Sequence, residues 1–209
     1  MPDAVRFRPA ILLAALLLIA VAAGIGAGRS RAQDPPPVLV VGDSLAVGLE
    51  PHLGAMLQPS AVVWDARSGR TTPQGLVRLR ARLREVAPRT VVISLGTNDG
   101  SDPRRFADRI RRVVLALPPR ACVIWPTIIR PPRKGPYAAL DRVLRDQARR
   151  DPRFVAPSWD YAVLRGNVRL PDGVHPDDFG FLYRSRMIAR AIRAGCDDRA
   201  RRTAFAQRR

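Results

Sequence analysis

The sequence predicts an α/β protein in which helices cover both faces of a parallel sheet. Apolar segments rich in Val and Ile alternate with segments of helical periodicity between residues 38 and 194. The apolar segments are nearly continuous rather than alternately apolar and polar, which is typical of strands buried on both faces. Strands that alternate with helices are usually joined by right-handed crossovers into one parallel sheet.

Five strands are predicted, over residues 38–41, 61–64, 90–95, 122–127 and 154–158. An Ala- and Leu-rich stretch that begins at Ser44 predicts a helix directly after the first strand. Amphipathic helices are predicted over 75–87 and 103–117, a shorter one around 140–144, and a last one over about 178–194. Asp102 and Pro103 indicate a helix start, because aspartate caps helices and proline favours their first position. The predicted core-facing helix residues are Leu76, Leu79, Leu83, Val86, Phe106, Ile110, Val113, Leu117, Leu140, Val143, Leu144, Leu182, Met187, Ile188 and Ile192.

The N-terminal part of the chain differs from the rest. Residues 9–27 form an uncharged apolar run behind two arginines, which is typical of a secretory signal or of an uncleaved membrane anchor. The tripeptide Ser30-Arg31-Ala32 offers a cleavage site, but positive charge there weakens the case for a cleaved signal, so both alternatives remain open. A buried core helix is less favoured, because the run has no polar face.

The expected organisation follows from these observations. Residues 1–32 are a signal peptide or membrane anchor, 33–37 a short stiff linker, 38–196 one α/β domain, and 197–209 a basic C-terminal tail. The protein is expected to be extracytoplasmic, either secreted or held on the membrane by its apolar segment.

The formal net charge is +18, and Lys134 is the only lysine among 36 basic residues. The arginines are scattered over every predicted helix, which favours solvent-facing decoration over a dedicated binding patch. An anionic membrane or cell-wall polymer is the second interpretation. A nucleic-acid partner is not expected, because no nucleic-acid-binding motif is present and the protein is expected to leave the cytoplasm.

The two cysteines are predicted to form a disulfide. Cys122 begins the fourth predicted strand, at the amino edge of the sheet. The last helix starts near the carboxyl edge and runs back, so Cys196 at its end returns to the same amino edge. An exported protein favours such a bond.

Polar motifs follow the predicted strands, at the sheet edge where α/β proteins place their sites. Gly42-Asp43-Ser44 follows the first strand, and Gly69 lies in the loop after the second. GTND at 96–99 follows the third strand, and PDGVHP at 171–176 comes after the fifth. A serine, a glycine, an asparagine and a histidine are therefore expected at one edge.

These residue types suit nucleophilic catalysis. A serine hydroxyl needs a base, and His175 is one of only two histidines in the chain. Asp172, three residues earlier, can bind the histidine Nδ1 and leave Nε2 to face Ser44. Donors for an oxyanion are available from the backbone N–H groups of Ser44 and Gly69 and from the amide of Asn98.

The motifs GDSL at 42–45, Gly69 in SGRTT, GTND at 96–99 and DGVH at 172–175 resemble the four sequence blocks of the SGNH (GDSL) hydrolase family. They stand in the family's order over residues 38–194. The resemblance implies a three-layer α/β/α, flavodoxin-like fold with a five-stranded parallel sheet. It also implies hydrolysis of esters or thioesters, or deacetylation of carbohydrates, by the Ser44, His175 and Asp172 triad.

Other residues are interpreted more simply. Asp43 is expected to tie down loop backbone, Asp99 to bond its local backbone, and His52 to have no catalytic role. No metal or other cofactor is expected, because two histidines and two distant cysteines lack the spacing of a ligand cluster.

The predicted function is an exported serine esterase that hydrolyses short acyl esters, with acetyl groups favoured because no long insertion suggests a lid. Alternatives are an acyltransferase on a cell-envelope polysaccharide and a non-catalytic basic module that binds the envelope. Arg130, Arg133 and Lys134, in the proline-rich loop 126–137, are either contacts for an anionic substrate or part of a solvated loop. The expected partner is a small-molecule or polysaccharide ester, and the protein is expected to be a monomer.

Overall fold

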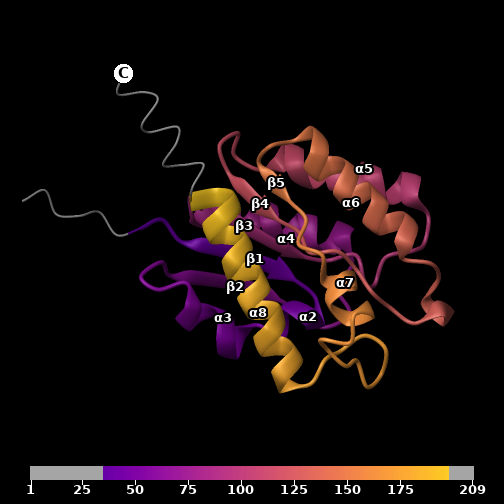
Figure 1. Cartoon of the computed structure of the whole chain (residues 1–209). Helices are drawn as coiled ribbons and strands as arrows, with labels where there is room; N and C mark the ends of the chain where they lie inside the picture. The colour runs from indigo at the N-terminus through magenta and orange to yellow at the C-terminus, as the bar shows by residue number, and fades with distance from the viewer. Residues whose placement is uncertain (1–34, 198–209) are drawn as a thin grey trace, which may run out of the picture. The chain divides into compact units, whose positions relative to one another are not determined.

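Five parallel strands form one sheet in the order β2-β1-β3-β4-β5 (Figure 1). They are β1 (Val38–Gly42), β2 (Val62–Ala66), β3 (Thr90–Ser94), β4 (Cys122–Ile124) and β5 (Phe154–Val155). This computed structural model describes residues 35–197, so the predicted signal or anchor and the tail beyond 197 lie outside the described residues. Among the helices within residues 35–197, none combines the length and the apolar character of a membrane span.

Helices α4 (Thr72–Glu85), α5 (Pro103–Ala116) and α6 (Ala138–Arg150) pack on one face of the sheet. Alternate strand residues point to this face, and they pack against the predicted apolar helix faces. Phe106, Ile110, Val113 and Leu117 are all buried there, as predicted. Trp125 lies in the same core and donates its indole N–H to the carbonyl of Leu95.

Helices α3 (Glu50–Met56) and α8 (Asp178–Ile192) cover the opposite face, with the long α8 lying across the strands (Figure 1). Ile188 and Ile192 of α8 are buried against β1, β3 and β4. The three-layer α/β/α fold predicted from the sequence is therefore confirmed.

Several predicted boundaries were wrong, and proline explains two of them. The predicted first helix is two short helices, α2 (Ser44–Val47) and α3, because Pro51 lacks the N–H that a continuous helix would need. Strands β4 and β5 are shorter than predicted, because Pro157 cannot donate to β4 and Pro126 cannot donate to β3. Helix α7 (Trp159–Leu164) and the one-turn η1 (Pro132–Lys134) were not predicted, and α8 passes into the π-helical turn η2 (Arg193–Asp197).

The predicted disulfide is present between Cys122 and Cys196, with the sulfur atoms 2.03 Å apart. It joins Cys122, the first residue of β4, to Cys196 in η2, the turn that follows α8. The two residues are separated by 74 positions, a closure worth about 4 kcal/mol in the chain-entropy model. The bond therefore fixes the chain just after the C-terminal end of α8 to the start of β4.

Candidate active site

Ser44 lies at the point where β1 passes into α2. Gly42 makes this close passage possible, because a Cβ there would lie 2.3 Å from the Ala46 Cβ and 2.8 Å from the Ser94 carbonyl oxygen. Asp43 is fully buried, and its carboxylate caps α2 by accepting the N–H of Leu45 at 3.0 Å. The side chain of Ser44 is thus held at the carboxyl edge of the central strands.

His175 and Asp172 reach Ser44 from the loop between α7 and α8. Ser44 Oγ lies 2.7 Å from His175 Nε2, and His175 Nδ1 lies 2.6 Å from Asp172 Oδ2. The other carboxylate oxygen of Asp172 accepts the backbone N–H groups of Val174 at 2.8 Å and His175 at 2.7 Å. This tight turn folds the carboxylate back onto the ring, as the three-residue spacing predicted.

The same contacts control the charge of Asp172. Its hydrogen bond with the His175 side chain, followed by the backbone N–H groups of His175 and Val174, lowers the pKa of the Asp172 carboxyl well below its usual range. Asp172 therefore stays ionised near neutral pH, where a histidine can accept a proton.

Asn98 and Gly69 lie at the ends of the neighbouring strands. Asn98 Nδ2 donates to Asp43 Oδ2 and to the Arg70 carbonyl, each at 3.3 Å. Gly69 is exposed in the turn after β2, with a φ of +75° and open space where a Cβ would lie. The turn begins beside β1, because Arg67 donates its N–H to the Gly42 carbonyl at 3.1 Å.

The structure thus brings the predicted residues to one edge of the sheet. Ser44, His175 and Asp172 form one hydrogen-bonded chain, and Asn98 donates to Asp43, the residue that precedes Ser44. Among the described residues, no hydrogen-bond acceptor is found for the backbone N–H of Ser44 or of Gly69. Both groups are available as donors to a bound carbonyl oxygen.

A buried cation behind the site was not predicted. Arg184 of α8 is 2% exposed, its guanidinium lies 4.6 Å from the centre of the Trp159 ring, and its Nη2 is 3.3 Å from Ser94 Oγ. Burial raises the pKa of Asp43 to about 6, and the Leu45 N–H and the positive charge of Arg184 oppose that rise. Burial also lowers the pKa of Arg184 to about 10. Its four-residue spacing from Ile188 was the signal that could have placed it on the buried face.

Arg130 was expected either to contact substrate or to lie in a solvated loop, and both expectations were wrong. It is 2% exposed and donates to the backbone carbonyls of Thr97, Asp99 and Gly135. The reason is that the loops after β3 and β4 expose carbonyls that a guanidinium can satisfy. Arg133 and Lys134 are exposed, as a solvated loop requires.

Asp99 was expected to bond its local backbone, which was also wrong. Its Oδ1 accepts the N–H of Thr72, 27 positions away, at 2.9 Å and lies 3.2 Å from Arg109 Nη1. Asp99 therefore joins the start of α4 to the loop that carries Asn98.

Comparison with known proteins places the chain in a family. The model of the GDSL-like lipase/acylhydrolase family matches residues 28–181. Esterase TesA of Pseudomonas aeruginosa is 34% identical over 159 residues, which cover 66% of this chain and 79% of that protein. Thioesterase 1/protease 1/lysophospholipase L1 of Escherichia coli K12 is 32% identical over 96 residues, covering 40% of this chain. The chain spans about half the length of that relative, 46%.

The fold has a close counterpart among solved structures. The C-terminal catalytic domain of peptidoglycan O-acetyltransferase A from Streptococcus pneumoniae superposes with a TM-score of 0.65 at 23% identity, covering 78% of this chain and 96% of that one. The order of the sequence blocks, the sheet topology and the match of the family model over most of the chain all indicate the same family. The chain belongs to the GDSL-like lipase/acylhydrolase family.

Proposed function

We propose that this protein is a serine esterase in which Ser44 attacks the carbonyl carbon of an acyl ester. The observation that carries the proposal is the continuous chain from Ser44 Oγ through His175 to Asp172, with contacts of 2.7 Å and 2.6 Å. A hydroxyl, a ring nitrogen and an ionised carboxylate in this order make up the arrangement that activates a serine.

The proposed reaction has two halves. His175 Nε2 takes the proton of Ser44 as the Oγ–carbon bond forms, and it returns that proton to the departing alcohol oxygen. A water molecule then gives its proton to His175 and attacks the acyl-enzyme, releasing the carboxylic acid and restoring Ser44. In both halves Asp172 stabilises the imidazolium, and the N–H groups of Ser44 and Gly69 bind the oxyanion. The Asn98 amide joins them by exchanging one of its two 3.3 Å contacts for the oxyanion.

The proposed substrate carries a short acyl group, such as an acetyl ester of an envelope polysaccharide. The connections that carry Gly69, Asn98 and His175, residues 67–71, 95–102 and 165–177, contain no helix. The names of the relatives include esterase, thioesterase and lysophospholipase, so esters of longer acyl chains belong in the same assay.

We further propose that the protein acts outside the cytoplasm. The uncharged run 9–27 supports export, and the Cys122–Cys196 disulfide suits an oxidising compartment. Fractionation of cells that produce the tagged full chain tests this: recovery of the protein in the cytoplasm with reduced cysteines would contradict it.

Hydrolysis of p-nitrophenyl esters of increasing chain length tests the proposed reaction. Ser44→Ala and His175→Ala are each expected to lower kcat by several orders of magnitude, because the members of such a unit act together. His52→Ala is the matched control, since it removes the other histidine of the chain and is expected to keep the wild-type rate. Equal rates in all four proteins would overturn the proposal.

The alternatives give different results in the same set of proteins. An acyltransferase would consume the ester faster when a sugar acceptor is added, with the acyl group recovered on the sugar. A non-catalytic envelope-binding module would bind anionic polymer in a salt-sensitive way, unchanged by Ser44→Ala.

A further inference from the structure

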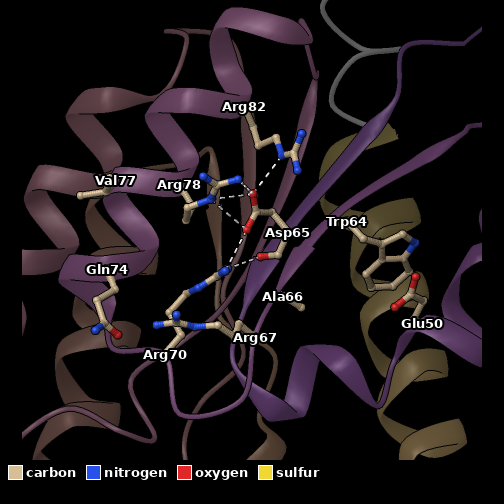
Figure 2. Close-up of a pocket in the computed structure, with 10 residues that line it drawn as sticks. All are labelled: Glu50, Trp64, Asp65, Ala66, Arg67, Arg70, Gln74, Val77, Arg78 and Arg82. Carbon is tan, nitrogen blue, oxygen red and sulfur yellow. Dashed lines mark hydrogen bonds and ion pairs between the residues drawn. The ribbon is translucent and has the colours of Figure 1, made fainter.

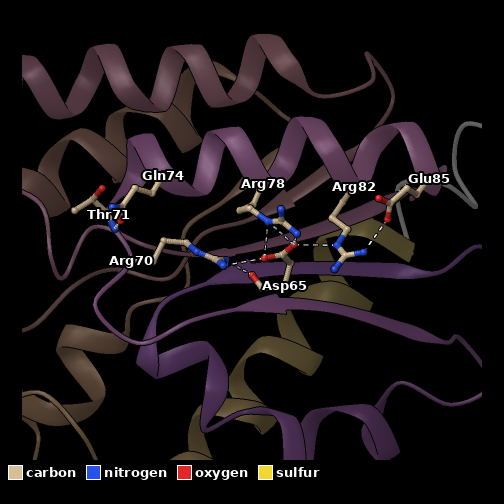
Figure 3. A network of polar contacts seen from close by, with 7 residues as sticks. All are labelled: Asp65, Arg70, Thr71, Gln74, Arg78, Arg82 and Glu85. Atoms are coloured by element: carbon tan, nitrogen blue, oxygen red, sulfur yellow. Dashed lines mark hydrogen bonds and ion pairs between the residues drawn. The ribbon is translucent and has the colours of Figure 1, made fainter.

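A buried carboxylate on the edge strand β2 binds three arginines (Figure 3). Asp65 Oδ1 lies 2.8 Å from Arg70 Nη2, and Asp65 Oδ2 lies 2.9 Å from both Arg78 Nη2 and Arg82 Nε. The Asp65 side chain is only 5% exposed. We call these four residues the Asp65 cluster.

The cluster lies in a pocket along β2, and Trp64 and Glu50 lie on the other side of the strand (Figure 2). Successive strand residues point to opposite faces, so Asp65 faces α4 while Trp64 faces away from it. The residues that line this pocket do not include Ser44, Asp172 or His175. The pocket is therefore separate from the reacting groups. The Asp65 cluster is connected to them through the turn after β2, which contains Arg70.

Arg70 differs from the other two arginines of the cluster. Arg78 and Arg82 project from α4, with side chains 47% and 30% exposed, whereas the Arg70 side chain is 6% exposed. Arg70 belongs to the turn after β2 and also donates from Nη1 to the backbone carbonyl of Asp65. Its guanidinium thus ties the far end of the turn back to the strand from which the turn departs.

The backbone of Arg70 contacts the catalytic edge. Its carbonyl accepts Asn98 Nδ2 at 3.3 Å, and its N–H donates to the Arg67 carbonyl at 3.2 Å. Gly69, immediately before it, has a φ of +75°, a conformation that glycine adopts without strain. One residue therefore connects the buried Asp65 to both Gly69 and Asn98.

The three arginines keep the Asp65 carboxyl ionised. Burial opposes ionisation of Asp65, but the hydrogen bonds from Arg78 and Arg82 and the nearby Arg70 outweigh it and lower the pKa of the carboxyl. An ionised, buried carboxylate holds a guanidinium more strongly than a neutral one would. With three cations on one carboxylate, loss of an exposed partner still leaves Arg70 its counter-ion.

We propose that Arg70 is a positioning residue for the oxyanion hole: its ion pair with Asp65 holds the 67–70 turn so that the Gly69 N–H and the Asn98 amide converge on the carbonyl oxygen of the ester. The inference rests on the proposed esterase function. Donors that must be aimed before the reaction act on the transition state rather than on substrate binding. Loss of Arg70 should therefore lower kcat and leave KM nearly unchanged.

The test is steady-state kinetics of the full chain with a short p-nitrophenyl ester, beside thermal unfolding of each variant. Arg70→Gln is expected to lower kcat by roughly 10- to 100-fold, the size of effect that a small misplacement produces. Arg70→Lys keeps the charge and one contact with Asp65, so it should recover part of that loss. Arg78→Gln is the matched control: it removes the same charge from the same carboxylate without touching the turn, and its kcat should stay within about threefold of wild type, as expected for a partly exposed ion pair.

Two results would overturn the inference. One is a folded Arg70→Gln or Arg70→Lys protein with wild-type kcat. The other is an equal fall of kcat in Arg70→Gln and Arg78→Gln, which would make the cluster a matter of stability alone. If Arg70→Gln does not fold, Arg70→Lys decides. Wild-type hydrolysis that survives Ser44→Ala would instead overturn the proposed function, so the two failures are distinguishable.

Discussion

At the scale of single residues, Asp172 performs two separable tasks. One carboxylate oxygen accepts two backbone N–H groups and shapes the turn, while the other binds His175 Nδ1. Only the second task needs a negative charge. The side chain is 54% exposed, so water supports the charge as well.

Asp172→Asn separates these two tasks. The amide oxygen can still accept the backbone N–H groups, but the amide NH₂ facing Nδ1 favours the tautomer that carries its proton on Nε2. That tautomer cannot accept the proton of Ser44, so kcat should fall by roughly 100- to 10⁴-fold while the fold is retained. Ester hydrolysis and circular dichroism measure the two effects. Asp178→Asn, which makes the same charge change on the exposed start of α8, should leave kcat unchanged, and a similar loss there would refute the tautomer argument.

At the scale of elements, aspartate side chains cap the starts of α2, α5 and α8, where the first N–H groups of a helix lack a backbone partner. Helix α5 is the clearest case: Asp102 Oδ1 accepts the N–H groups of Arg104 at 2.9 Å and Arg105 at 3.2 Å, and Pro103 follows it. Asp102 also faces Arg105 at 3.4 Å in an exposed ion pair, which contributes little to stability.

Asp102→Ala is therefore expected to lower the free energy of unfolding by about 1 kcal/mol through loss of the cap. Urea unfolding measures the change. Asp102→Asn keeps a capping oxygen but removes the charge, so it should cost much less. If the two variants are equally destabilised, the ion pair rather than the cap stabilises the start of α5.

At the scale of the whole molecule, two buried carboxylates link stability to pH. Burial raises the pKa of Asp43 to about 6 and that of Asp141 to about 7. Asp141 Oδ1 accepts the Ile128 N–H at 2.6 Å. This hydrogen bond and the charges of Arg145 and Arg130 oppose the rise in the Asp141 pKa, whereas the charge of Asp160 adds to it. Both groups bind protons more tightly when folded than when unfolded, where an aspartate titrates near 4.

Below about pH 4 both carboxyls are protonated in the folded and in the unfolded state, so they do not change the free energy of unfolding. As the pH rises further, the unfolded state releases its protons first, and the free energy of unfolding falls until the pH passes about 7. The free energy of unfolding should thus drop by a few kcal/mol between pH 5 and pH 8, at about 1.4 kcal/mol per pKa unit. Urea titrations at each pH measure it. Asp141→Asn should flatten the upper part of the curve, whereas Asp146→Asn on the same helix should not; a wild-type curve that is level over this window would contradict the assignment.

Much of this protein could be predicted before its structure was known, for identifiable reasons. The strands near 38–41 and 90–95 were predicted because buried parallel strands are apolar throughout. The buried face of α5 was predicted because its apolar residues recur every three or four positions. Where prolines interrupt a ladder or a helix, as at Pro51 and Pro157, periodicity alone set the boundary in the wrong place.

The amino-acid sequence was sufficient to predict the family, the order of the elements and the edge of the sheet where the polar motifs lie. These follow from local patterns: strand ends, short motifs and helix caps are encoded within a few residues. The pairing of Cys122 with Cys196 was also predictable, because the fold class dictates the direction in which the last helix runs.

Which charged residues are buried, and what they bind, could be seen only in the folded protein. Arg70, Arg130 and Arg184 are arginines like the many exposed ones of this chain, yet each is buried. Their partners, Asp65, the loop carbonyls and Trp159, lie on other elements or at the ends of other strands. The physical reason is that a guanidinium is buried only where several acceptors or a ring meet it, and that meeting exists only after the sheet and its loops have assembled.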